Sequence, residues 1–334
     1  MANSSEPNNS NFSIKQNYSD EHLELTAKDG MNFWFNQGFT WLVYVFAMIT
    51  VLVLFSMCWV IFYEAKPAII QFGIGFLWGN DWDTGNQIFG ALPYIYGTLV
   101  SSAIAIFFAI PIGIAVALVT SENFLPLSVQ TTLAFIVELI AAIPSVIIGL
   151  WSIFIFIPVL EPLQKWLASN LKWVPLFNSQ DPVGTNMLTA GIILAIMILP
   201  TMAAITRDVL IAIPKELRTA SMALGSTRWE TIFRVLLPAG FSGIVSAAML
   251  ALGRALGETM AVTMVIGNSA QISASLLDPA YTIPAVLANE FAEAEPGLYI
   301  GALSYLGLIL FALTLIVNIG AVLLVQWVGK TNSS

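Results

Sequence analysis

Long uninterrupted apolar runs constrain the fold of this chain more than any other feature of its sequence. They predict membrane spans at 40–63, 95–119, 131–160, 187–206, 241–266 and 301–327. About 20 consecutive apolar residues let a helix cross the hydrocarbon core of a bilayer. Only 10% of the residues are charged, far below the roughly 25% of a typical soluble domain. The sequence therefore predicts an all-α, polytopic membrane protein with about six transmembrane helices.

The two ends of the chain lie outside these runs. Residues 1–39 form a polar N-terminal tail and 328–334 a short C-terminal tail, which leaves 40–327 as one transmembrane domain. The first residues lack the apolar stretch and the small-residue cleavage site of a signal peptide. Proline is tolerated in membrane helices and marks kinks there, as we expect at Pro111, Pro144 and Pro158.

The distribution of basic residues predicts the orientation of the chain, because Lys and Arg concentrate in cytoplasmic loops. The segment 207–240 carries the basic residues Arg207, Lys215, Arg218, Arg228 and Arg234. The segment 267–300 carries acidic residues and no basic ones. Placing 207–240 in the cytoplasm puts both termini there as well, and this orientation rests mainly on that one loop.

The segment 207–240 is too long for a tight turn, and helix-forming stretches lie on either side of Gly225. Pro214 suits the first turn of a helix, and Gly225 is placed to end it. Apolar residues recur between them at helical spacing at Leu217, Ala220 and Leu224. A second short helix, expected from Ser226 to Pro238, would carry Trp229, Phe233 and Leu236.

This segment resembles the cytoplasmic loop shared by ABC importer permeases. That loop reads Glu-Ala-Ala, three residues, Gly, nine residues, Ile, one residue, Leu-Pro. The matching positions are Ala220, Gly225, Val235, Leu237 and Pro238, with Glu216 beside them. Thr219 and Ser221 replace the Glu and the second Ala. The resemblance implies a helix that inserts into a cleft of a separate ATPase subunit. The alternative is a solvated amphipathic loop whose basic residues serve topology alone.

Three ionisable side chains lie deep within the apolar runs, at Glu138, Arg254 and Glu258. Each costs about 2.5–3.5 kcal/mol at the centre of a membrane helix, so each needs a partner or a water-filled cavity. Arg254 and Glu258 are four residues apart, which predicts one helical face. They form either a structural ion pair or part of an anion path, since a guanidinium matches phosphate oxygens.

The role of Glu138 and that of the glycines beside Arg254 are two further questions about the intramembrane charges. Glu138 is either the partner of a basic group on another helix or a lone protonated acid. Gly253 and Gly257 flank Arg254 as a pair of small residues. That spacing lets another helix approach closely.

Four segments make a closer resemblance specific. They are GRALGETMAV at 253–262, ELIAAIPSVIIGLW at 138–151, ILPTMAAITRDVL at 198–210, and the stretch 91–118. They look like the PstC family of phosphate-transport permeases, and the similarity extends over most of 40–327. It implies a type I ABC importer permease fold in a bacterial inner membrane. In that family the Arg and Glu of the RALGE segment, here Arg254 and Glu258, are implicated in phosphate passage. Glu138 is a further candidate for that path.

The same resemblance implies the partners and the substrate. They are a PstA-like permease, two copies of a PstB-like ATPase, a PstS-like external binding protein and inorganic phosphate. ATP with Mg would bind the partner ATPase, because this chain has Leu324 where a Walker A motif before Gly329-Lys330-Thr331 needs Gly. We therefore expect a transporter subunit with no cofactor of its own rather than an enzyme. No basic stripe suits nucleic acid, and no His, Asp and Glu spacing suits a metal.

Two alternatives to phosphate import remain at this point. The chain could be a permease for another oxyanion, such as sulfate or molybdate, because Arg254 and Glu258 do not select among them. In a different class, it could be an intramembrane enzyme or receptor that uses Glu138 and Glu258.

Overall fold

The fold was taken from a computed structural model that describes residues 10–122, 124–180, 182 and 184–331. All regular elements in this part of the chain are helical, and only two isolated β-bridges accompany them. The chain divides into two compact units, Met1–Val60 and Ile61–Ser334. The expectation of an all-α protein is confirmed.

The first unit consists of one helix. Helix α1 spans Ser10–Phe72 and continues into the second unit. It therefore begins within the polar segment 1–39, and the apolar run predicted at 40–63 is only part of a longer helix. All side chains from 37 to 57 are exposed. Such a surface requires lipid or other protein surface around it, because it is too apolar for water.

The second unit contains the remaining helices. The long ones are α2 (Leu92–Ser121), α6 (Met187–Ala212) and α13 (Leu298–Thr331). A continuous helical stretch runs through α4 (Ser145–Trp151), the π-helical turn η2 (Ser152–Phe156) and α5 (Ile157–Asn170). The shorter elements are η1 (Gly73–Leu77), α3 (Leu127–Ala141), η3 (Pro175–Phe177), α7 (Lys215–Ala223), α8 (Arg228–Thr231), η4 (Ile232–Leu236), α9 (Leu237–Ala239), α10 (Phe241–Gly257), α11 (Met260–Val265) and α12 (Ile283–Glu290).

Five described helices are long and apolar enough to cross a membrane, and a sixth span arises if α8–α9 and α10 count as one bent crossing. The axes of that pair differ by 70°. The prediction of about six transmembrane helices is confirmed within this range.

Two of the predicted spans are broken in the structure. The run 131–160 is interrupted between α3 and α4, where Pro144 caps α4 with an extended backbone. Proline lacks an N–H and disfavours the helical conformation of the residue before it, which explains this break. The run 241–266 is interrupted after Gly257 and resumes as a helix at Met260. Helix α10 has 17 residues, about 25 Å of rise, so it is short for a complete span.

The core of the second unit is built around α6. In its most apolar window 61% of residues are buried, against 28% or less in the other candidate spans. Ile193, Leu194, Ile198 and Met202 are almost fully buried there. Helix α6 packs most extensively on α2 and next on α10. A Cβ on Gly191 would lie 2.5 Å from the Ile104 side chain, so the close approach of α6 to α2 depends on this glycine.

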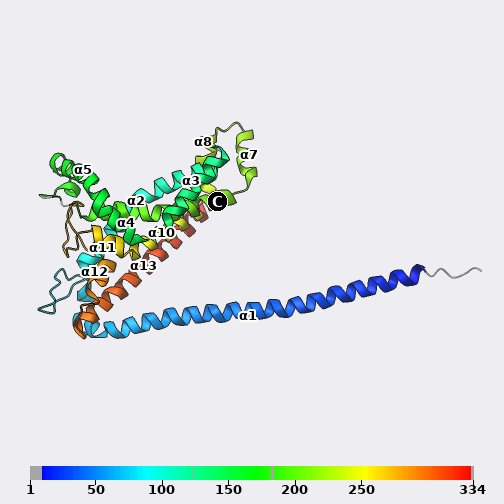
Figure 1. Cartoon of the computed structure of the whole chain (residues 1–334), viewed down its shortest axis with the longest axis horizontal. Coiled ribbons are helices and arrows are strands. Elements are labelled where there is room, and N and C mark those ends of the chain that lie inside the picture. The colour runs from blue at the N-terminus through cyan, green and yellow to red at the C-terminus, as the bar shows by residue number, and fades with distance from the viewer. Residues whose placement is uncertain (1–9, 123, 181, 183, 332–334) are drawn as a thin grey trace, which may run out of the picture. The chain divides into compact units, whose positions relative to one another are not determined.

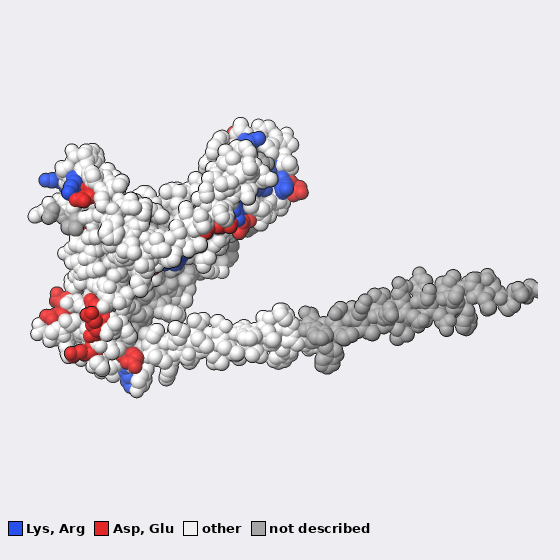
Figure 2. Space-filling view, viewed as in Figure 1, with Lys and Arg blue, Asp and Glu red and all other residues white. Residues whose placement is uncertain are grey.

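Charged side chains mark the two ends of the second unit. Figure 1 shows α7 and α8 together at one end, whereas α5 and α12 lie at the other. Figure 2 shows mainly acidic side chains over the α12 region and both signs of charge over the α7–α8 end. The basic segment 207–240 and the acidic segment 267–300 are thus separated, as the positive-inside rule requires of a membrane protein.

Candidate translocation site and docking loop

An open hollow lies beside Arg254 in the apolar part of the second unit. It has a volume of about 590 Å³ and is formed by residues of α6, α10 and α13. Its lining consists of Thr201, Met249, Leu250, Gly253, Arg254 and Asn318. Three polar side chains from three helices thus meet at one place among otherwise apolar surroundings.

The guanidinium of Arg254 is exposed to this hollow and has few partners. Its Nη1 donates to the hydroxyl of Thr201 at 3.3 Å. It forms no ion pair with any carboxylate in the described part of the chain. An arginine has five N–H donors, so most of them remain available to an anion that enters the hollow.

Glu258 does not share a helical face with Arg254, contrary to the expectation from their spacing. Helix α10 ends at Gly257, and Glu258 has an extended backbone with ψ of 124°. Its carboxylate accepts a hydrogen bond from the backbone N–H of Ala261 at 3.4 Å. The alternative of a structural ion pair is not seen among the described residues, and Glu258 instead marks the break between α10 and α11.

Glu138 has a partner on another helix, which decides between the two alternatives left open for it. Its carboxylate lies 3.4 Å from Nη2 of Arg207. Arg207 belongs to α6 rather than to the loop, because α6 continues to Ala212. This pair lines a small separate hollow together with residues of α2, α3 and α6. Glu138 is therefore not placed beside Arg254.

The small residues that flank Arg254 do not contact another helix of this chain. No described atom lies within 4 Å of a Cβ built on Gly253 or on Gly257. A helix that packs closely against this face is therefore not one of the described helices of the second unit. Without such a helix, the face borders the hollow itself.

Asn318 is a site residue that the sequence reasoning missed. It lies in the apolar part of α13, lines the same hollow as Arg254 and has no hydrogen-bond partner among the described residues. An unpaired amide at membrane depth is costly, which is a reason to assign it a role. The available signal was an amide deep within the run 301–327, whose other amide, Gln326, lies at its end.

We predict that Asn318→Leu weakens the binding or passage of an anion in the hollow about 5- to 10-fold, as expected for the loss of one neutral hydrogen bond worth roughly 1 kcal/mol or slightly more. Uptake of the labelled anion into vesicles that contain the protein would measure this. Thr314→Val, one turn earlier on the same helix, is the matched control, because the Thr314 hydroxyl donates to the carbonyl of Leu310 within its own helix. Equal uptake in Asn318→Leu and the unaltered protein would remove Asn318 from the site.

The loop between α6 and α10 forms the second candidate site. Helix α7 begins directly after Pro214, as predicted, and its C-terminal glycine Gly225 has a φ of +89°. Only glycine adopts such a conformation without strain, so Gly225 ends the helix as expected. Exposed apolar side chains cover this end: Leu217, Met222, Leu224, Trp229 and Phe233. Trp229 also packs on Phe124 and stacks with Phe233.

The second helix of the loop differs from its prediction at its end. Thr227 and Glu230 form a reciprocal capping box at its start. The backbone N–H and hydroxyl of Thr227 donate to the Glu230 carboxylate and lower its pKa. Pro238 does not close the helix, because the chain stays helical through Ala239 and bends at Gly240. Proline is tolerated there because it occupies the first turn of α9.

The two departures from the ABC permease loop pattern have structural explanations. The hydroxyl of Ser221 is 2.9 Å from that of Thr231, and this buried contact joins α7 to α8. The hydroxyl of Thr219 donates to the carbonyl of Glu216 within α7 itself, at 3.0 Å. Position 219 is exposed and uncharged, so it offers a partner chain no carboxylate.

The other motif residues remain predictions. Glu216, Ala220 and Pro238 are exposed, whereas Val235 and Leu237 are partly buried. A second residue missed from the sequence is Glu122, which follows α2 and forms an ion pair with Arg218 of α7 at 2.9 Å. Their separation by 96 residues explains why no local pattern indicates the pair.

Comparison with known proteins gives consistent matches. Residues 109–330 match the family model described as binding-protein-dependent transport system inner membrane component. The chain is 44% identical over 261 residues to the phosphate transport system permease protein PstC of Mesorhizobium japonicum, covering 77% of this chain and 80% of that one. It is 40% identical over 289 residues to the PstC protein of Pasteurella multocida, covering 85% and 90% respectively.

Solved structures support the fold class. A bacterial ABC transporter that imports the acidic polysaccharide alginate matches with a TM-score of 0.52 and 18% identity, covering 88% of this chain and 98% of that one. An inward-facing form of the MetNI methionine ABC transporter matches with a TM-score of 0.50 and 18% identity, covering 72% and 94% respectively. At such identity the likeness concerns the fold alone, and it confirms the expected ABC importer permease architecture.

Proposed function

This chain belongs to the family of binding-protein-dependent transport system inner membrane components, and we propose that it is a permease subunit of an ATP-driven importer of inorganic phosphate. The observation that carries the proposal is Arg254, whose guanidinium faces an open hollow with most of its donors unused. A planar guanidinium fork binds phosphate oxygens in a bidentate way. The names of the PstC relatives, which are phosphate transport permeases, support phosphate rather than another oxyanion as the proposed substrate of this chain.

The residues around the hollow suggest how an anion would pass. Arg254 supplies positive charge, while Thr201 and Asn318 offer neutral polar contacts from neighbouring helices. Passage requires binding that is favourable but weak enough for release. An exposed Arg254 that holds one hydrogen bond meets this requirement better than a buried, fully paired one. Glu258, at the break after α10, would keep the anion from remaining bound by like-charge repulsion.

The hollow is open on one side, and a second permease of PstA type would complete it. The exposed face at Gly253 and Gly257 and the exposed apolar helix α1 both supply surface for such a partner. Two copies of a PstB-like ATPase would dock on the loop that contains α7, and a PstS-like binding protein would deliver phosphate from outside. The loop and both termini would then lie in the cytoplasm of a bacterium.

Reconstituted vesicles test the substrate directly. With the partner subunits and binding protein present, we expect phosphate to stimulate ATP hydrolysis and a tenfold excess of sulfate to leave labelled-phosphate uptake within about twofold of its original rate, because specificity is a difference of affinities. Equal competition by sulfate would favour a general oxyanion permease. If the chain purifies without an ATPase and no ATP-dependent uptake occurs, the importer function is wrong.

A further inference from the structure

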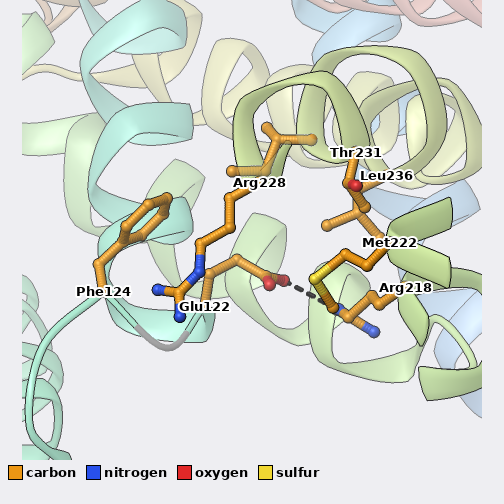
Figure 3. A pocket seen from close by; sticks show the side chains of 8 residues that line it. Glu122, Phe124, Arg218, Met222, Arg228, Thr231 and Leu236 are labelled. Atoms are coloured by element: carbon orange, nitrogen blue, oxygen red, sulfur yellow. Dashed lines mark hydrogen bonds and ion pairs between the residues drawn. The ribbon is translucent and has the colours of Figure 1, made fainter. Parts of the chain in front are cut away.

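A partly buried ion pair connects the docking helix to the membrane helices. The Nε and Nη2 atoms of Arg218 donate to the same carboxylate oxygen of Glu122 at 3.1 and 2.9 Å. Both side chains are only 16% exposed. Figure 3 shows the two groups joined by this ion pair in the lining of a pocket, which has a volume of about 140 Å³.

The same guanidinium also binds the end of α6. Its Nη2 donates to the carbonyl of Leu210 at 2.7 Å and its Nη1 to the carbonyl of Ile213 at 2.8 Å. The last carbonyls of a helix have no partner within it, and the negative end of its dipole attracts a cation. One side chain of α7 therefore contacts the C-terminal ends of both α2 and α6.

Helix α7 has few other attachments to the rest of the molecule. Among the side chains of Lys215–Ala223, only those of Arg218 and Ser221 are not exposed. Ser221 contacts Thr231 of the neighbouring short helix α8, so it does not reach α2 or α6. Apart from the backbone at Ile213 and Pro214, Arg218 provides the polar connection from α7 to the membrane helices in the described part of the chain.

Of the two helices that Arg218 binds, α6 lines the hollow beside Arg254 and α2 packs against α6. Helix α6 carries Thr201, which contacts Arg254, and it packs most extensively on α2. A rigid movement of α7 would therefore pull on the central helix pair through charge-assisted hydrogen bonds, which are the strong and directional kind.

We propose that Glu122 and Arg218 are positioning residues that transmit the movement of the docked α7 to α2 and α6. This inference rests on the proposed importer function and adds the contact through which the ATPase would act on the membrane helices. Neither residue lines the hollow beside Arg254. Loss of this ion pair would therefore uncouple ATP hydrolysis from transport. If the pair only stabilised the fold, its loss would instead lower the amount of folded complex.

The test compares Arg218→Gln and Glu122→Gln with the unaltered chain in the complete, reconstituted transporter. We expect the ATPase still to copurify and hydrolysis without phosphate to stay within about twofold. Phosphate-stimulated hydrolysis and the phosphate imported per ATP should fall on the order of tenfold. Arg218→Lys should recover only part of the coupling, because one ammonium cannot reach the carboxylate and both carbonyls with a fixed fork.

Lys165→Gln is the matched control, because it breaks an exposed ion pair with Glu161 on α5, far from the docking loop. It should leave the phosphate imported per ATP unchanged. The proposed coupling role of Glu122 and Arg218 is wrong if Arg218→Gln and Glu122→Gln also leave this ratio unchanged. It is equally wrong if they lower assembly, hydrolysis and uptake in equal proportion. If the unaltered complex itself shows no phosphate-stimulated hydrolysis, the importer function fails instead.

Discussion

Replacing Arg254 with Gln is expected to lower phosphate uptake by a factor of about 10 to 150, while the complex still assembles. The range follows from the loss of one charge-assisted hydrogen bond, which contributes about 1.5–3 kcal/mol, and two lost bonds would abolish measurable uptake. Folding should change little, because the guanidinium is exposed and holds one hydrogen bond, to Thr201. Uptake of labelled phosphate into vesicles measures the effect.

Two further variants make the Arg254 result specific. Arg254→Lys keeps the charge but removes the planar fork, so uptake should fall less than in Arg254→Gln. Arg207→Gln removes an arginine that is paired with Glu138 in a separate hollow, and it should retain most of the uptake. Normal uptake in Arg254→Gln would remove the proposed anion path.

Replacing Leu224 with Asp is expected to abolish binding of the ATPase subunit. Leu224 is 89% exposed at the end of α7, so its apolar surface has no packing partner inside the chain. A charge at the centre of an apolar docking surface must be desolvated on binding, which costs several kcal/mol when it is left unpaired. Copurification of the ATPase with the tagged permease measures the loss, and ATP-dependent uptake should disappear with it.

The matched control for Leu224 is Trp173→Asp. Trp173 is 80% exposed in the segment between α5 and α6, away from the docking loop. It should leave the ATPase bound, because the introduced charge is outside the docking surface. Undiminished copurification with Leu224→Asp would mean that α7 does not enter the ATPase, and the solvated-loop alternative would then apply.

The spans that the sequence predicts well are those with continuous apolar runs and nothing to interrupt them. The runs 187–206 and 301–327 correspond to α6 and α13, which extend beyond them by a turn or more at one end or the other. The break at Pro144 had a chemical signal. The break after Gly257 had almost none, because glycine weakens a helix by only about 1 kcal/mol relative to alanine.

Long-range packing decides what the local pattern leaves open. Helix α11 packs against α4 and α12, and this packing sets the chain direction after Glu258. A spacing of four residues predicts a shared face only where the helix is unbroken, so the expectation that Arg254 and Glu258 share a helical face was wrong.

The site itself was predictable in part. Arg254 stands out because a cation is rare in an apolar run, and the docking loop stands out by its glycine and Leu-Pro spacing. The roles of Glu122 and Asn318 depend on residues that are distant in the chain. Glu122 forms an ion pair with Arg218, and Asn318 lines a hollow together with residues of α6 and α10. Glu138 was found as an intramembrane acid, but only the structure identifies Arg207 as its partner.

The sparse attachment of α7 has a consequence for protein engineering. Among the side chains of Lys215–Ala223, all but those of Arg218 and Ser221 are exposed, so the other positions tolerate substitution more readily than these two. The helix is therefore suited to exchange as a cassette between related permeases. Exchanging its exposed residues while keeping Arg218 and Ser221 would direct the permease to a different ATPase subunit and leave the residues that line the hollow unchanged.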